Sequence, residues 1–190
     1  MKQELVRKFF HMLFGAGFLG LIYFFGSEIS FVVILSFFVV GLILALLIKN
    51  GFKNKILNSI LNIVEREHEK HFPGKAALLF FISATVVIYF FKNEPLIILA
   101  SLGTLIFGDS FAALIGKKFG TRIILSKNNY TKTLEGTIAC FLVSLIWISL
   151  FFPIYIAIIA ALVGTLIEFF PINDNLLMPT AVAIIIKLLI

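Results

Sequence analysis

The chain has 190 residues, of which 61% are hydrophobic and 14% are charged. Soluble domains contain about 45 to 50% apolar residues, so this composition excludes an ordinary soluble domain and predicts an integral membrane protein. The net charge of +6 does not require a nucleic-acid partner, because basic residues also gather at the cytoplasmic ends of membrane helices.

Apolar runs recur along the whole chain. A helix needs about 17 to 25 residues to cross the bilayer core, and several runs reach or approach that length. We expect a single all-α domain over residues 1–190, a multi-pass transmembrane helical bundle with about seven spans. The expected spans are 9–26, 29–48, 76–91, 96–116, 134–152, 154–169 and 176–190.

Two long polar connections separate these runs. In the first, Phe52, Ile56, Ile60 and Val64 recur at fourfold spacing, which predicts an amphipathic helix on the membrane surface. The second, residues 117–136, is basic and rich in Gly and Asn, which indicates an irregular loop.

The basic residues indicate the orientation in the membrane. All but two of the 16 Lys and Arg residues fall in the N-terminal segment and these two connections, the exceptions being Lys92 and Lys187. Since Lys- and Arg-rich loops stay in the cytoplasm, we expect a multi-pass protein of the cell membrane whose N-terminus and long loops are cytoplasmic.

The segment "GDSFAALIGKKFG" places Asp109 inside an apolar run. On a helix, Ala113, Gly116 and Gly120 follow on the face of Asp109, and a stripe of small residues can serve close helix packing alone. A buried carboxylate is otherwise a functional hypothesis by default. It can bind a divalent metal or a proton, and Lys117 one to two turns later suits the phosphates of a nucleotide.

The segment "KTLEG" returns the chain to the membrane with Lys132, Glu135 and Gly136 on one helical face. Glu135 can also be there because a first-turn carboxylate favours the helix dipole. Lys132 can likewise extend to lipid headgroups. The alternative for Lys132 is to bind phosphate. The alternative for Glu135 is to bind a second metal ion or to accept a proton from the substrate, a role that Asp174 could equally fill.

The N-terminal segment "RKFFH" places Arg7 and His11 one turn apart, with Lys8 beside them. Juxtamembrane basic residues are often lipid anchors, which is the simpler interpretation. His11 requires a polar partner, because it lies one turn inside the expected span.

The segment "EFFPINDN" joins the last two expected spans. Either Asp174 or Asn175 is expected to cap the final helix, and this is the preferred role for Asn175. Asp174 is alternatively a candidate ligand for a second metal ion or an acceptor for a proton. Glu168 is a second intramembrane carboxylate and is expected to support the site from the lipid side.

The expected topology brings these residues to the same cytoplasmic face. Carboxylates for metal and cations for phosphate beside a lipid phase predict a nucleotide-using enzyme with a lipid substrate. There is no GxxxxGK[ST] segment, so an ordinary P-loop is excluded. A proton- or cation-coupled transporter is the alternative from another class, although it would place charges deep in several spans.

The segments "RKFFH", "REHEKHFPGKAALLFF", "GDSFAALIGKKFG", "KTLEG" and "DNLLMP" occur in that order. Together they resemble the polyprenol kinase family, which includes dolichol kinase, phytol kinase and CTP-dependent diacylglycerol kinase. The third and fourth segments also resemble the CTP site of CDP-diacylglycerol synthases. The chain lacks the extra N-terminal spans of eukaryotic dolichol kinases and the long C-terminal signature with paired aspartates of the synthases.

The resemblance implies CTP-dependent phosphorylation of a membrane lipid alcohol, of the polyprenol, dolichol, phytol or geranylgeraniol type. It implies CTP as phosphoryl donor and Mg²⁺ as the divalent metal. The alternative is a cytidylyltransferase that makes a CDP-lipid from phosphatidate or an ether-lipid analogue. The implied partners are CTP, the lipid alcohol and the bilayer, and a homo-oligomer is left open.

The resemblance assigns roles to residues of the matched motifs. The roles given to Asp174, His11, Glu168 and Asn175 rest on the residue patterns alone. Arg7, Lys8, Asp109 and Glu135 are the implied catalytic residues, and Asp109 and Asp174 are the expected metal ligands. The expected nucleotide-binding residues are Gly116, Lys117, Lys132 and Gly136. His11, Glu168 and Asn175 are expected to support the site.

Overall fold

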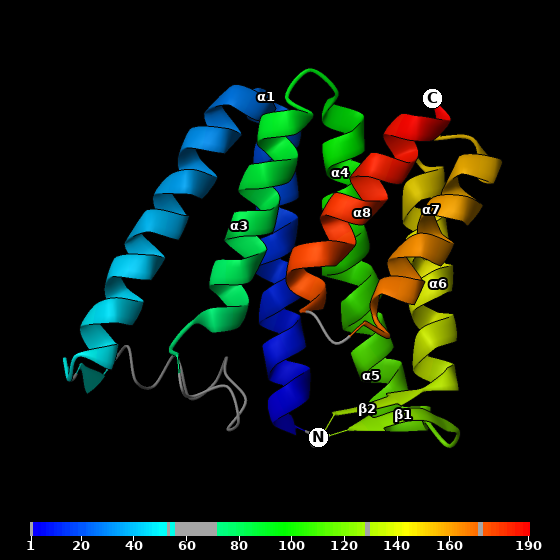
Figure 1. Cartoon of the computed structure of the whole chain (residues 1–190), viewed down its shortest axis with the longest axis horizontal. Coiled ribbons are helices and arrows are strands. Elements are labelled where there is room, and N and C mark those ends of the chain that lie inside the picture. Colours follow the sequence, from blue (N-terminus) through cyan, green and yellow to red (C-terminus); the bar gives the residue numbers. More distant parts are fainter. Residues whose placement is uncertain (1, 53, 56–71, 128–129, 171–172) are drawn as a thin grey trace.

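The computed structural model describes residues 2–52, 54–55, 72–127, 130–170 and 173–190, and these residues are mostly helical (Figure 1). The amphipathic helix expected around Ile56, Ile60 and Val64 lies largely outside the described residues.

The first helix, α1, spans Lys2–Lys49 and contains one break in its helical geometry, at Gly26. The φ angle there is 77° and the ψ angle 174°, a conformation that only glycine adopts without strain. Figure 1 shows the consequence: α1 reverses direction, and its two arms run along the bundle in opposite directions.

Five further helical segments follow in the described part of the chain. Their bounds agree with the apolar runs of the sequence to within a few residues. They are α3 (Lys75–Phe90), the continuous series α4 (Pro95–Gly103), η2 (Thr104–Asp109) and α5 (Ser110–Phe119), α6 (Leu134–Ser149), α7 (Ile154–Ile167) and α8 (Asp174–Leu189).

The expected count of seven separate helices is therefore corrected to six continuous ones among the described residues. The reason is that the runs 9–26 and 29–48 belong to the single helix α1. Two helical stretches, Glu4–Lys49 and Pro95–Phe119, are long and apolar enough to cross a membrane. The helices α3, α6 and α7 are apolar but shorter.

The connection expected to be irregular instead contains a two-stranded antiparallel hairpin. Strand β1 (Ile123–Lys127) pairs with β2 (Tyr130–Thr133), and the register shifts between Ile123 and Leu125. The sequence pattern does not predict these strands, because each is only four or five residues long and the alternation of β-branched and basic residues is too short to be recognised. This hairpin lies at the same end of the bundle as the N-terminus (Figure 1).

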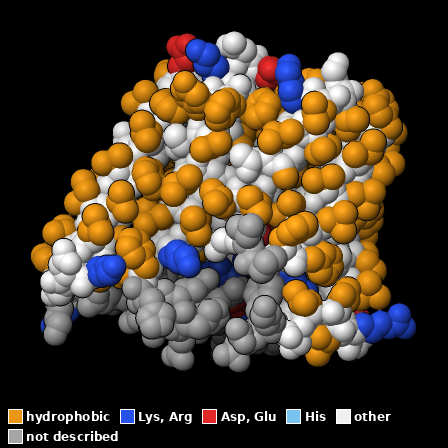
Figure 2. Space-filling model, viewed as in Figure 1, with side chains coloured by type: hydrophobic (Ala, Val, Ile, Leu, Met, Phe, Trp, Pro, Cys, Tyr) orange, Lys and Arg blue, Asp and Glu red, His pale blue; other side chains and the backbone are white. Residues whose placement is uncertain are grey.

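Hydrophobic side chains cover the length of the helices, whereas charged side chains gather near the two ends (Figure 2). Inside the bundle, η2 and α4 lie at the centre of the core, where Leu102, Leu105 and Ile106 are fully buried. The helices therefore carry apolar side chains on their exposed surfaces as well as in the core.

Close packing in this core depends on a contact between α4 and α6. The Trp147 Nε1 donates a hydrogen bond of 3.0 Å to the backbone oxygen of Leu99. A Cβ atom added at Gly103 would overlap the indole ring of Trp147. Only a residue without a side chain allows the two helices to approach in this way.

We expect Gly103→Ala to lower the free energy of unfolding by about 1 to 3 kcal/mol, because the overpacked indole must shift and lose its hydrogen bond. Thermal unfolding in detergent measures the effect. Gly17→Ala is the matched control, since an added Cβ there meets nothing within 4 Å. The control is expected to gain about 0.5 to 1 kcal/mol from helix propensity, and equal melting temperatures for the two variants would contradict the packing argument.

Candidate functional site

A buried ion pair joins the first helix to the centre of the bundle. Lys8 of α1 and Asp109, the last residue of η2, form a salt bridge and hydrogen bond between the lysine Nζ and the carboxylate Oδ2. Both residues are buried, Lys8 at 3% and Asp109 at 8% exposure. Two opposite charges are therefore buried in apolar surroundings, and their mutual attraction offsets part of the desolvation cost of each.

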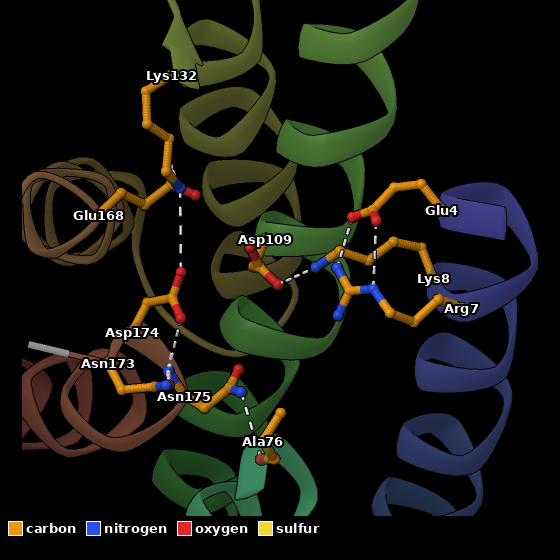
Figure 3. Close-up of polar contacts among 10 residues, drawn as sticks. All are labelled: Glu4, Arg7, Lys8, Ala76, Asp109, Lys132, Glu168, Asn173, Asp174 and Asn175. Carbon is orange, nitrogen blue, oxygen red and sulfur yellow. Dashed lines mark hydrogen bonds and ion pairs between the residues drawn. The ribbon is translucent and has the colours of Figure 1, made fainter. Parts of the chain in front are cut away.

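The π-helical segment η2 sets the position of Asp109. Short π-helical segments inside α-helices are rare and occur frequently at functional sites. Here the wide turn brings Gly108 against α6, where a Cβ atom would lie 2.5 Å from the Ser144 Oγ. Asp109 follows directly, and its carboxylate points toward Lys8 of the first helix (Figure 3).

A second charged group lies on the other side of Asp109. The Nζ of Lys132, on strand β2, lies 3.2 Å from the Oε2 of Glu168 and 3.9 Å from the Oδ2 of Asp174. Glu168 lies in the connection between α7 and α8, and Asp174 is the first residue of α8. The hairpin thus places the Lys132 ammonium group between the C-terminal end of α7 and the N-terminal end of α8.

We call these five residues the buried charge cluster: Lys8, Asp109, Lys132, Glu168 and Asp174. Figure 3 shows Asp109 between Lys8 on one side and the group of Lys132, Glu168 and Asp174 on the other. With every member ionised, two cations and three carboxylates leave one formal negative charge inside the protein. The cluster can accept a further cation, or a proton.

Glu168 is the least satisfied member of the cluster. Its side chain is fully buried, and neither carboxylate oxygen makes a hydrogen bond within the described part of the chain. The contact with Lys132 is an ion pair by distance without hydrogen-bond geometry.

The N-terminal residues divide between two environments. Arg7 donates to Glu4 one turn earlier, with 2.5 Å between Nη2 and Oε1, beside the Lys8–Asp109 pair (Figure 3). The His11 ring packs edge-on against Phe80 with 5.9 Å between centroids. Its Nε2 is buried and has no hydrogen-bond partner among the described residues.

Gly116 and Gly136 lie where α5 crosses α6. A Cβ atom at Gly116 would lie 2.8 Å from the Thr133 Oγ1 and 3.4 Å from the Gly136 Cα. The space behind Gly116 is thus filled by protein, which favours the packing interpretation of the small-residue stripe over open space for a nucleotide. Thr133 also caps α6, accepting a hydrogen bond of 3.2 Å from the Gly136 amide.

Glu135 does not join the buried charge cluster. Its Oε1 accepts hydrogen bonds from the Thr121 hydroxyl at 2.6 Å and from the Arg122 amide at 3.3 Å. These contacts fasten the first turn of α6 to the start of the hairpin. Glu135 thereby helps to seat the strand that carries Lys132.

The other two predicted positions are at the edge of the site. Lys117 is exposed near the C-terminal end of α5. Asn175 donates from its side-chain amide to the Ala76 oxygen at 3.3 Å, which ties α8 to α3. The capping residue of α8 is Asn173, which accepts a hydrogen bond of 3.1 Å from the Asn175 backbone amide. The cap therefore lies one residue before Asp174 and two before Asn175, the two positions expected.

The cluster offers a small donor set for a divalent ion. Among the described residues no group of three or more His, Cys, Asp or Glu side chains is placed to bind a metal. Magnesium ordinarily uses one or two protein carboxylates together with water and substrate phosphates. Asp109 and Asp174, in a cluster with an excess negative charge, fit that smaller donor set.

Some residues of this region carried no sequence signal. Ser110 and Ser144 are buried beside η2, and their hydroxyl oxygens have no hydrogen-bond partner among the described residues. Serine is common in apolar helices, so nothing in the sequence distinguishes these two. Glu4 could have been found from its spacing of three residues from Arg7, since such pairs meet on a helix.

The fold and the buried charge cluster define the class of protein: a predominantly helical protein with two helices able to span a membrane and charged residues enclosed at one end. The chain belongs to the family of the uncharacterized protein MJ1137 of Methanocaldococcus jannaschii. The two are 30% identical over 191 residues, which cover 97% of this chain and 93% of that protein. No family model matches the chain, and no solved structure matches it.

Proposed function

We propose that the protein is a CTP-dependent lipid kinase of the polyprenol kinase type, which transfers the γ-phosphoryl group of CTP to the hydroxyl of a membrane lipid alcohol. The buried charge cluster at one end of an apolar bundle carries this proposal. Phosphoryl transfer needs positioning and neutralisation of charge more than covalent chemistry, and lysines beside carboxylates supply both. The choice of CTP rests on the resemblance of "GDSFAALIGKKFG" and "KTLEG" to that family.

The residues of the cluster have separate roles in this proposal. Lys8 and Lys132 bind phosphate oxygens, and Arg7 adds a third cation at the same end. Asp109 and Asp174 would hold Mg²⁺, which supplies charge neutralisation for the transferring phosphoryl group. Glu135 acts as a positioning residue through the hairpin. His11, on the apolar side of Lys8, supports the region where the lipid hydroxyl enters.

The same proposal includes the arrangement in the membrane. Both arms of α1, the series α4–η2–α5, and the helices α3, α6, α7 and α8 would give seven crossings. The end that carries the N-terminus and the hairpin would face the cytoplasm, where CTP is found. The short turn between α3 and α4, at the opposite end in Figure 1, would face away.

The decisive experiment supplies the purified protein with CTP labelled at the γ-phosphate, Mg²⁺ and a mixture of lipid alcohols. Labelled lipid phosphate and CDP are the expected products. Unlabelled CDP-lipid and labelled pyrophosphate would identify a cytidylyltransferase instead. No nucleotide turnover with any lipid, together with transport of cations in vesicles, would favour a transporter.

We expect the two ends of the bundle to be labelled from opposite sides of the membrane. Single cysteines at Asn54, Asn93 and Ser126, in a background where Cys140 is replaced, are treated with a membrane-impermeant maleimide in intact cells and in inverted vesicles. Asn93→Cys should react in intact cells, and the other two only in inverted vesicles. Labelling of Ser126→Cys but not Asn54→Cys in intact cells would contradict the orientation and separate CTP from the cluster.

A further inference from the structure

We infer that Glu168 is a catalytic residue of the proposed kinase: it binds the hydroxyl of the lipid alcohol and accepts its proton. This inference rests on the proposed function and chooses among its carboxylates. Sequence patterns favoured Glu135 or Asp174 for this step. The structure points to a third carboxylate.

The other carboxylates near the site are already occupied by protein donors. Asp109 accepts a hydrogen bond from Lys8. Asp174 accepts one of 3.0 Å from the Asn175 amide. Glu135 is held by Thr121 and Arg122 at the base of the hairpin.

Glu168 differs from them because it is fully buried and its close contact is the ion pair with Lys132. The residue is 2% exposed, and both its oxygens lack hydrogen bonds within the described residues. Leaving a buried carboxylate oxygen without a donor is costly. A lipid hydroxyl would supply that donor, and the geometry needed for proton transfer is the same hydrogen bond.

The position of Glu168 also suits a substrate that arrives from the lipid phase. Leu166 and Phe170, on either side in the sequence, are 57% and 58% exposed apolar residues. The chain around Glu168 thus exposes apolar side chains, while the buried Glu168 carboxylate lies next to Lys132 (Figure 3). The apolar tail of a lipid alcohol can contact the exposed apolar side chains while its hydroxyl group reaches the Glu168 carboxylate.

Lys132 brings together the two reacting groups, the phosphate of the nucleotide and the hydroxyl of the lipid. Its Nζ is 3.2 Å from Glu168, so a phosphate bound to Lys132 lies next to a hydroxyl bound to Glu168. The charged and titratable groups that face Glu168 are Lys132, Asp109, Asp174 and the buried thiol of Cys140. The two aspartates oppose ionisation of Glu168, and Lys132 favours it.

The transfer step balances with the groups named. The lipid hydroxyl oxygen forms a bond to the γ-phosphorus of CTP while the bond from that phosphorus to the β–γ bridging oxygen breaks. CDP leaves, and the hydroxyl proton passes to the Glu168 carboxylate. Glu168 later releases this proton to water, which completes the turnover.

The test compares the whole protein with its Glu168→Gln variant, using a lipid alcohol that the unaltered protein phosphorylates. We expect kcat to fall by at least about a hundredfold, as for loss of a general base, while the Kd for CTP, measured by equilibrium dialysis with labelled nucleotide, stays within about threefold. Retained CTP binding shows that the variant is folded. Glu94→Gln is the matched control, because Glu94 pairs with Lys187 at the opposite end of the bundle.

The pH dependence separates proton transfer from a structural role. For the unaltered protein we expect kcat to rise with pH over the range in which the Glu168 carboxyl loses its proton, since the base must be ionised. The remaining activity of Glu168→Gln should lack this rise. Turnover of Glu168→Gln close to that of the unaltered protein, or an unchanged pH profile, overturns the inference while the kinase assignment stands. Absence of lipid phosphorylation by the unaltered protein instead overturns the proposed function itself.

Discussion

Asp109→Asn is expected to reduce lipid phosphorylation by at least about a hundredfold, in the range found when one group that stabilises transition-state charge is removed. The amide keeps the size of the carboxylate but loses the charge that a divalent ion requires. It also leaves Lys8, which is 3% exposed, without a counter-charge. Turnover with labelled CTP over a range of Mg²⁺ concentrations measures the effect.

The metal role predicts a specific result in that titration. Raising Mg²⁺ should not restore the turnover of Asp109→Asn, whereas lowering Mg²⁺ should abolish that of the unaltered protein. Ser36→Ala serves as a control, because the Ser36 hydroxyl donates to the backbone of its own helix, to the Val32 oxygen at 2.7 Å. Unaltered turnover in Asp109→Asn would remove this residue from the mechanism.

Lys8→Met is expected to lower the free energy of unfolding by about 3 to 5 kcal/mol, the usual cost of removing one partner from a buried ion pair. Asp109 would remain as an uncompensated charge in the core. The measurement is equilibrium unfolding of the purified protein in mixed micelles, followed by Trp147 fluorescence.

Two further variants isolate the cause of that loss. The double variant Lys8→Met/Asp109→Asn should recover most of the lost stability, because no unpaired charge is left, but it should stay inactive. Lys187→Met removes a partner from the half-exposed pair with Glu94, in which the lysine side chain is 52% exposed, and should cost less than about 1 kcal/mol. Equal losses for Lys8→Met and Lys187→Met would show that burial of the first pair does not matter.

The helices could be predicted because hydrophobic runs alone define them. Every apolar run from residue 76 onward corresponds to a helix whose ends differ by a few residues from the expectation. The error at α1 has a local cause, since one glycine with positive φ, Gly26, reverses the direction of the chain without a loop between the two arms. The polar residues Ser27 and Glu28 distinguish this glycine from Gly17 and Gly20, and the expected spans 9–26 and 29–48 separate at this point. The sequence did not show that the chain would reverse inside a continuous helix.

The sequence predicts which residues form the candidate site better than it predicts which of them contact one another. Residue type and expected topology were enough to select Lys8, Asp109, Lys132, Glu168 and Asp174. They were not enough to find that Lys8 pairs with Asp109 while Lys132 contacts Glu168. Those pairings depend on the hairpin and on the π-helical turn of η2, neither of which has a periodic pattern in the sequence.

The five members of the buried charge cluster come from four separate segments of the chain, and this has a consequence for the order of folding. Lys8 and Asp109 are 101 residues apart in the chain, and Asp174 belongs to the last helix. Contacts between such distant residues form late, after the loops between them have closed. During synthesis Lys8 leaves the ribosome long before Asp109 is made. The first helix therefore carries the Lys8 charge without its ion-pair partner during that time. We therefore expect nascent chains that stop before α8 to remain substrates of quality-control proteases. The protein should become resistant to these proteases once the buried charge cluster is complete.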